Sequence, residues 1–173
     1  MMEILNEFPG ITITYINDEA ISAGAIISSV TDHIYFSPLG IMGSAAAIQM
    51  TGEEIPETMK AKLYSYLDAR IESYSLNKRL RNKVLKAMID KDFEFVEDNV
   101  LISPKDKLLA LTAPKAFTPF GDPPEPLVAA GIAESVEEIF EYGFGAEEVE
   151  ITEFEQTWSE EVATIPSRAQ TWR

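Results

Sequence analysis

Near the start of the chain, an alternating β-branched run is followed by a run of small apolar side chains. Residues 11–17 read ITITYIN, which is typical of a strand, and residues 20–30 favour a buried helix. Between them, Ala20, Ser22 and Gly24 form an A-x-S-x-G pattern. A serine at a sharp turn from strand to helix needs small neighbours, because bulky side chains would block the approach of backbone and substrate. The pattern indicates Ser22 as a candidate nucleophile, although it also suits a small residue at a tight, buried turn.

The wider sequence resembles the ClpP-class membrane-associated serine peptidases, the N-terminal domains of NfeD-like proteins. In that family a strand leads into V-N-x-x-A-x-S-A-G-A, then a helix, a short strand and a Pro/Gly loop. The counterparts here are residues 12–17, residues 20–25, the run to Val30, and HIYFSPLGIMGSAAAI at residues 33–48. The resemblance continues through LLALTAPKA and PLVAAGIAES, so it covers most of residues 8–142.

The resemblance implies an α/β fold with the β-α-β spiral core of the ClpP/crotonase superfamily. We expect this domain in residues 1–150, followed by a C-terminal strand and polar tail in residues 151–173. In the family, a strand–helix–strand portion with a Gly-rich turn precedes the helix that corresponds to residues 2–8. The chain shows no counterpart of that portion, so we expect the domain to be incomplete at its N-terminus.

Acyl transfer by a serine needs a base for its proton and donors for the developing oxyanion. The resemblance implies Ser22 as the nucleophile and the backbone N–H of Ala23 as one oxyanion donor. A second donor usually comes from the Gly-rich turn that is not found here.

The general base is harder to assign, because the family resembles Ser-Lys dyad enzymes. Aligning residues 71–73, IES, with the family's I-K-S puts Glu72 where the lysine would stand. Lys62, nearly three turns earlier on the same predicted helix, is a weaker candidate. His33 is a further candidate, but no orienting acid is apparent and Asp32 is expected on the other strand face.

Two functions therefore remain open at this stage. The first is a serine endopeptidase acting on a peptide or protein substrate. The second is a catalytically inactive, peptidase-like module for binding or oligomerisation. Crotonase-type acyl-CoA chemistry also requires stabilisation of an oxyanion, but no feature of the sequence indicates a CoA ligand.

The charge of the chain argues against nucleic-acid partners. It has 29 acidic and 14 basic residues, and a net charge of -15 repels phosphates and anionic membrane surfaces. The basic residues are concentrated between Lys60 and Lys91, and none lies between Ala116 and Ser167. This asymmetry is compatible with a homo-oligomer, which the family resemblance also implies, and with a solvated acidic face.

The sequence predicts neither a metal centre nor a cofactor. It has no cysteine, and His33 is its single histidine, so a cysteine site or a histidine-rich site cannot form within one chain. It contains no apolar run of about 18 residues, and its first residues do not resemble a signal peptide. The resemblance implies membrane association through a C-terminal domain that is not found here, with the peptidase domain outside the cytoplasm.

Other elements are predicted from periodicity. We expect a helix over residues 2–8, and two helices marked by the stripes Met59, Leu63, Leu67, Ile71 and Leu80, Val84, Leu85, Met88, Ile89. Residues 93–102 alternate as a hairpin with Asp98 and Asn99 at its turn, and a further strand follows within residues 103–111. A short helix, a Pro-rich loop, a strand-like piece and a last helix are expected within residues 112–143, and a final strand over 149–158.

Overall fold

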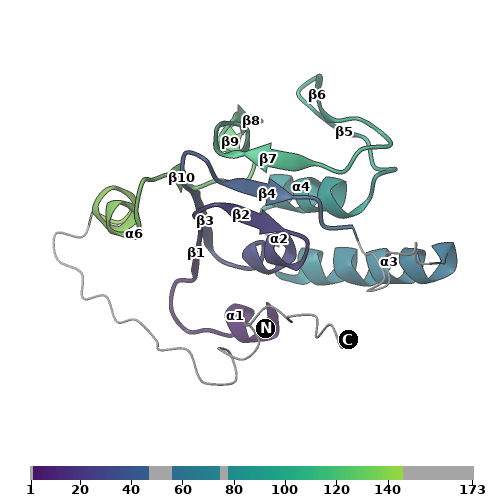
Figure 1. The fold of residues 1–173 in the computed structure, drawn as a ribbon, viewed down its shortest axis with the longest axis horizontal. Helices are drawn as coiled ribbons and strands as arrows, with labels where there is room; N and C mark the ends of the chain where they lie inside the picture. Colours follow the sequence, from purple (N-terminus) through teal and green to yellow (C-terminus); the bar gives the residue numbers. More distant parts are fainter. Residues whose placement is uncertain (1, 47–55, 75–77, 146–173) are drawn as a thin grey trace, which may run out of the picture.

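The computed structural model describes residues 2–46, 56–74 and 78–145. Its N-terminal half begins with helix α1 (Met2–Asn6) and then repeats one arrangement, two strands followed by helix, twice (Figure 1). The first unit contains β1 (Ile13–Ile16), β2 (Glu19–Ile21) and α2 (Ala23–Ser28). The second begins with β3 (His33–Phe36) and β4 (Ile41–Gly43). The predicted α/β class is confirmed.

The two strands of each unit enter different sheets. One sheet has the order β1-β3-β10 with all pairs parallel, where β10 is Gly131–Ile132. The other has the order β2-β4-β7, in which β2 is parallel to β4 and β7 (Ala110–Thr112) is antiparallel. The chain thus advances as a spiral, and equivalent turns of the two units lie beside each other.

Close contact between these turns requires small residues. The Ser37 hydroxyl in the second turn donates to the backbone carbonyl oxygen of Asn17 in the first. A Cβ atom at Gly40 would lie 2.6 Å from the carbonyl oxygen of Ile16, so a side chain there would push the turns apart. The sheets are therefore aligned by backbone contact as well as by apolar packing.

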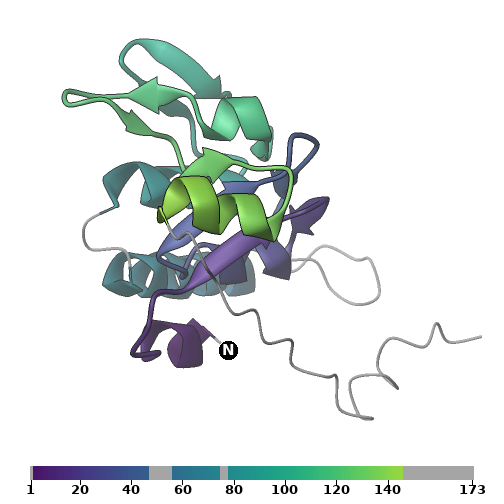
Figure 2. The same ribbon diagram turned by 90° about the vertical axis from the view of Figure 1, so that its left-hand side faces the viewer.

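Two helices pack together on one side of the sheets (Figures 1 and 2). Helix α3 is Glu57–Tyr74 and helix α4 is Arg79–Ile89. The predicted stripe of α4 is confirmed, because all five of its apolar residues are buried. The stripe of α3 holds only in part, since Ile71 is buried whereas Met59 is 60% exposed. The core between helices and sheets includes Ile34, Phe36, Met42, Leu85, Met88, Phe95 and Leu111.

The remaining elements are short. Strands β5 (Phe95–Glu97) and β6 (Val100–Ser103) form the predicted hairpin, with Asp98 and Asn99 at positive φ angles of 48° and 63° as a two-residue turn requires. Helix α5 (Ala113–Ala116) precedes a second hairpin of β8 (Pro119–Phe120) and β9 (Glu125–Pro126). Helix α6 (Val136–Glu138) continues into the π-helical turn η1 (Ile139–Gly143).

The structure corrects one prediction in the region of Ser22 and adds a strand that the sequence did not indicate. The helix expected over residues 20–30 is limited to Ala23–Ser28, because residues 19–21 form strand β2. Strand β4 was not predicted at all. Both strands have three residues, too few for periodicity to reveal, and they form because a neighbouring strand pairs with them. The strand predicted over residues 149–158 and the boundary at residue 150 lie outside the described residues.

Candidate active site

Ser22 stands between the end of β2 and the start of α2, where it is the N-cap residue. Its φ and ψ angles are 54° and -123°, a conformation that residues other than glycine rarely adopt. The residue is exposed, and its side chain makes no capping hydrogen bond to α2. An exposed serine on a strained strand-to-helix turn has the local geometry of a nucleophile elbow.

Contacts on both sides hold the backbone of Ser22 in this conformation. Its N–H donates to the carbonyl oxygen of Gly43 on β4 over 3.2 Å, and its own carbonyl oxygen accepts from the Ile26 N–H over 3.4 Å. Gly43 has a φ of 148°, and a Cβ atom there would collide with the carbonyl oxygen of Leu109. Strand β4 can approach Ser22 in this way because position 43 has no side chain.

The N–H of Ala23 is available as an oxyanion donor. Ala23 is the first residue of α2, and the first N–H groups of a helix have no acceptor within the helix. Ala23 is also exposed, so a substrate carbonyl can reach its backbone. The arrangement is compatible with one donor beside the candidate nucleophile, and the oxyanion role of Ala23 stays a prediction.

A second serine lies beside Ser22, which the sequence did not indicate. Strands β2 and β4 are parallel, their last pair is Ile21 and Gly43, and Ser22 and Ser44 are the residues that follow it on the two strands. Ser44 is exposed, has a positive φ of 47°, and is anchored by its N–H to the Leu109 carbonyl oxygen at 3.0 Å. Recognising Ile41–Gly43 as a strand would have shown that both serines follow neighbouring strand ends.

The two base candidates on α3 are both exposed. Lys62 and Glu72 are ten residues apart, which corresponds to about 15 Å along a helix, so they cannot both adjoin Ser22. Within the described residues, neither side chain forms a hydrogen bond or ion pair with Ser22.

His33 lies beyond the opposite end of α2 from Ser22. Its ring meets the edge of Phe144 with ring centres 5.5 Å apart, and burial, followed by the charge of Lys78, lowers its pKa. The carboxylate of Asp32 accepts hydrogen bonds from the Thr12 N–H and hydroxyl, both at 2.8 Å, and these hydrogen bonds lower its pKa. Asp32 is thus engaged away from His33, and the two residues do not form an oriented acid–base pair with Ser22.

Two further observations concern metal binding and membrane crossing. None of its His, Asp and Glu side chains gather in groups of three that could hold a metal ion. None of its helices combines the length and apolar character needed to cross a bilayer.

Comparison with known proteins places this geometry in a family context. The family model for the N-terminal domain of NfeD1b matches residues 1–153. The membrane protein NfeD1b of Bacillus subtilis (strain 168) is 33% identical over 117 residues, which are 68% of this chain and 25% of the relative. The chain thus spans about a quarter of the length of this curated relative.

Two solved structures share the fold. Both are variants of the 1510-N membrane-bound stomatin-specific protease, one changed from lysine to alanine and bound to a substrate peptide, the other changed from serine to alanine. Each superposes with a TM-score of 0.57 and 19% identity over 81% of this chain, covering 55% and 58% of the respective solved chains. The predicted ClpP-like fold is thereby confirmed.

Proposed function

Because the chain belongs to the family of NfeD1b N-terminal domains, we propose that it is a serine peptidase domain that cleaves peptide bonds through Ser22. The observation that carries this proposal is the backbone of Ser22, which is held at a φ of 54° at an exposed strand-to-helix turn. Strain of this kind persists only where surrounding contacts enforce it, and it is concentrated at functional sites. Here the hydrogen bond to Gly43 and the start of α2 enforce it.

The chemistry follows from the groups at this turn. The Ser22 Oγ attacks the substrate carbonyl carbon while a base takes the hydroxyl proton, and the Ala23 N–H donates to the oxyanion. Collapse of the intermediate breaks the C–N bond, and the protonated base gives its proton to the leaving amine. Water then attacks the acyl-enzyme, which releases the carboxylic acid and returns the proton to Ser22.

A peptide can be aligned with Ser22 by the outer edge of β2, with which no strand pairs in the part of the chain that the structure describes. This strand lies at one edge of the β2-β4-β7 sheet, and alternate residues of a parallel strand bond to the same neighbour. Ser22 N–H and Asp18 C=O bond to β4, so the backbone groups of Glu19 and Ile21 are directed to the unpaired side. An extended peptide that added itself there would run directly into the Ser22 turn.

Lys62 is the base that we propose. In the two solved proteases, the changed lysine follows the changed serine by about forty positions. Lys62 follows Ser22 by nearly the same interval, and Glu72 by ten more. A lysine acts as a base only when it is neutral, which requires removal from water. Because Lys62 is exposed, its activation requires that bound substrate or a second copy of the chain covers it.

A catalytically inactive binding or assembly module is the second candidate. The observation that favours it is the absence of a hydrogen-bonded base at Ser22 among the residues described. The concentration of basic residues in α3 and α4 and the acidic remainder of the chain supply complementary surfaces for self-association. Association with a membrane, proposed from the name of the Bacillus subtilis relative, would apply to either function.

Labelling with a fluorophosphonate probe separates the two functions. A peptidase should be labelled covalently, and Ser22→Ala should abolish the labelling while Ser65→Ala, which changes an exposed serine on α3, should not. Circular dichroism and size-exclusion chromatography would confirm that both variants remain folded. Absence of labelling in a folded, self-associated wild-type sample would overturn the peptidase proposal and support the assembly module.

A further inference from the structure

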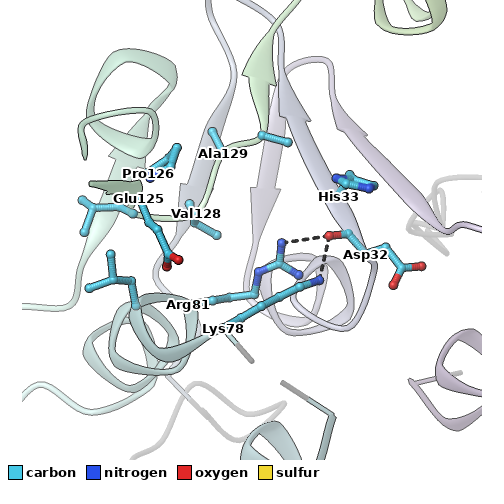
Figure 3. Close-up of a pocket in the computed structure, with 11 residues that line it drawn as sticks. Asp32, His33, Lys78, Arg81, Glu125, Pro126, Val128 and Ala129 are labelled. Carbon is cyan, nitrogen blue, oxygen red and sulfur yellow. Dashed lines mark hydrogen bonds between the residues drawn. The ribbon is translucent and has the colours of Figure 1, made fainter. Parts of the chain in front are cut away.

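A cavity of about 300 Å³ lies at the start of α4, at the end of α2 opposite to Ser22 (Figure 3). Two cationic side chains, Lys78 and Arg81, form one wall. Leu80 of α4 also lines the cavity, and the remaining walls come from Asp32 and His33 at the start of β3, from strand β9 and from the segment that precedes β10, with the aliphatic residues Pro126, Leu127, Val128 and Ala129. The cavity thus combines a basic wall with an apolar one.

The cations of this cavity bind only neutral backbone oxygens. Arg81, which is 7% exposed, donates from Nη1 to the carbonyl oxygens of Thr31 at 2.5 Å and Ser29 at 3.3 Å, and from Nη2 to that of Asp32 at 3.3 Å. Lys78 Nζ donates to the same Asp32 oxygen at 2.7 Å. Across the described ranges, neither forms an ion pair with a carboxylate.

The position of these charges on α4 is unfavourable without an anion. Lys78 is the N-cap of this helix, Arg79 and Arg81 lie in its first turn, and that turn contains no acidic residue. The N-terminus of a helix already carries partial positive charge, which favours anions. Arg79 has a counterion in Glu97 at 2.8 Å, but no carboxylate among the described residues forms an ion pair with Lys78 or Arg81.

Burial makes the lack of a counterion more costly. A buried charge is stabilised when it is paired, and the carbonyl groups at the end of α2 supply only partial negative charge. Burial lowers the pKa of Arg81 to about 10, and it lowers the pKa of Lys78, with a further contribution from the charge of Arg81. The charge of Asp32 raises both pKa values, but by less than burial lowers them.

The two acidic side chains that line the cavity, Asp32 and Glu125, do not pair with Lys78 or Arg81. The Asp32 carboxylate is held by Thr12 and points away from the cavity in Figure 3. Glu125 lies on the opposite wall and is exposed, and it forms no ion pair with Lys78 or Arg81. The cavity therefore presents two cations and free space, in a chain whose net charge is -15.

We propose that this cavity is a binding site for a small carboxylate with a short aliphatic body. Lys78 and Arg81 hold the carboxylate at the N-terminal end of α4, and Leu80 and Val128 pack against the aliphatic part. The volume is at the lower end of the range for small-molecule sites, about 300 to 1,000 Å³, which suits a ligand of this size. The site is separate from Ser22 and does not rest on the proposed peptidase activity.

Butyrate is the probe for the test, and butyramide is its neutral control. In a titration of the full, isotopically labelled chain followed by NMR, butyrate should shift the amide signals of Val128 and Ala129 and reach saturation. Butyramide should produce no saturable shift at these signals, because it lacks the charge that the two cations require. Inorganic phosphate should bind more weakly than butyrate, since it cannot use the aliphatic wall.

Three substitutions make the test specific. Lys78→Gln should weaken butyrate binding about tenfold or more, because it removes one charged hydrogen bond. Glu125→Gln should strengthen binding several-fold, because it removes a negative charge from the facing wall. Lys105→Gln, at an exposed loop position, is the matched control and should leave binding unchanged.

The substitutions are made at Lys78 and Glu125 and not at Arg81, because replacing the buried Arg81 endangers folding. Thermal unfolding of each variant would confirm that the fold is retained. Equal binding of butyrate and butyramide, tighter binding of phosphate, or unchanged affinity in Lys78→Gln would each overturn the proposal.

Discussion

The backbone N–H of Ser22 and the carbonyl oxygen of Gly43 are joined by a hydrogen bond of 3.2 Å, which ties the candidate nucleophile to the neighbouring strand. Strand β4 is in turn close to the chain at Leu109, where a Cβ atom on Gly43 would collide with backbone. The conformation of Ser22 therefore depends on the absence of a side chain one strand away.

Gly43→Ala should disturb both the fold and the Ser22 turn. The φ of 148° and the collision with Leu109 predict a loss of roughly 1–3 kcal/mol in the free energy of unfolding, measured by denaturant titration. Gly24→Ala is the matched control, because its Cβ would meet only the Ala20 Cβ, at 3.8 Å. If both variants had wild-type stability, the close approach at Gly43 would not be a constraint.

Ser44→Gly should slow the reaction at Ser22 without affecting the fold. Glycine accepts the φ of 47° at this position, so the substitution removes the hydroxyl and leaves the backbone unstrained. We expect the Ser44 hydroxyl to donate a hydrogen bond to the bound probe, so its removal should lower the labelling rate about tenfold. The rate constant for fluorophosphonate labelling measures this effect. Ser73→Ala, at an exposed position on α3, is the control, because alanine preserves the helix whereas glycine would weaken it.

The outcome for Ser44 is informative in either direction. Partial recovery by Ser44→Asn, which restores a polar side chain and tolerates positive φ, would support a hydrogen-bonding role. An unchanged labelling rate in Ser44→Gly would show that the register neighbour of Ser22 does not contribute to its reactivity.

Much of the fold was predictable because long elements carry strong periodicity. The apolar stripe of α4 and the Asp98-Asn99 turn each follow from local sequence and are confirmed. Strands β2 and β4 were missed because three-residue strands contain too few residues to show alternation. Their formation depends on pairing between residues about 22 positions apart, which local propensity does not describe.

Local sequence likewise does not reveal which distant residues meet at the candidate sites. Ser22 was found because its small neighbours are adjacent in sequence, whereas Ser44 becomes its neighbour only through strand register. The charged wall at Lys78 and Arg81 likewise requires the end of α2 to meet the start of α4. The assignments of Ser22, Ala23, Lys62 and Glu72 to catalytic roles stay predictions.

Lys62→Ala should abolish labelling of Ser22 if Lys62 is the base, while Glu72→Ala should leave it intact. The base takes the proton of the Ser22 hydroxyl, so removal of the Lys62 amine should leave no labelling at any pH tested. Lys60→Ala is the matched control, since Lys60 lies on the same helix and its ammonium group pairs with Glu57 at 3.6 Å. Labelling that survived in Lys62→Ala but not in Glu72→Ala would assign the role to the carboxylate.

Glu97 should contribute stability that depends on pH. It is buried on β5, and its carboxylate accepts hydrogen bonds from Lys83 at 2.6 Å and Arg79 at 2.8 Å, which connect the hairpin to α4. These two hydrogen bonds, that from Lys83 first, lower the pKa of Glu97 below its usual 4.5. Glu97→Gln should therefore lower the free energy of unfolding at pH 7 by about 1–2 kcal/mol.

The sign of the pH dependence distinguishes this ion pair from simple packing. A carboxylate whose pKa is lowered by folding contributes its full stability above its unfolded pKa, and loses it as pH falls through the folded value. The difference between wild type and Glu97→Gln should thus be constant from neutral pH down to about 5, and should shrink as the pH falls below 4.5. Denaturant titrations at several pH values measure it, with Glu94→Gln, an exposed neighbour, as the control. A difference that stayed constant through acidic pH would mean that Glu97 stabilises the hairpin by shape alone, because the charge of its carboxylate would then contribute nothing to the contact with α4.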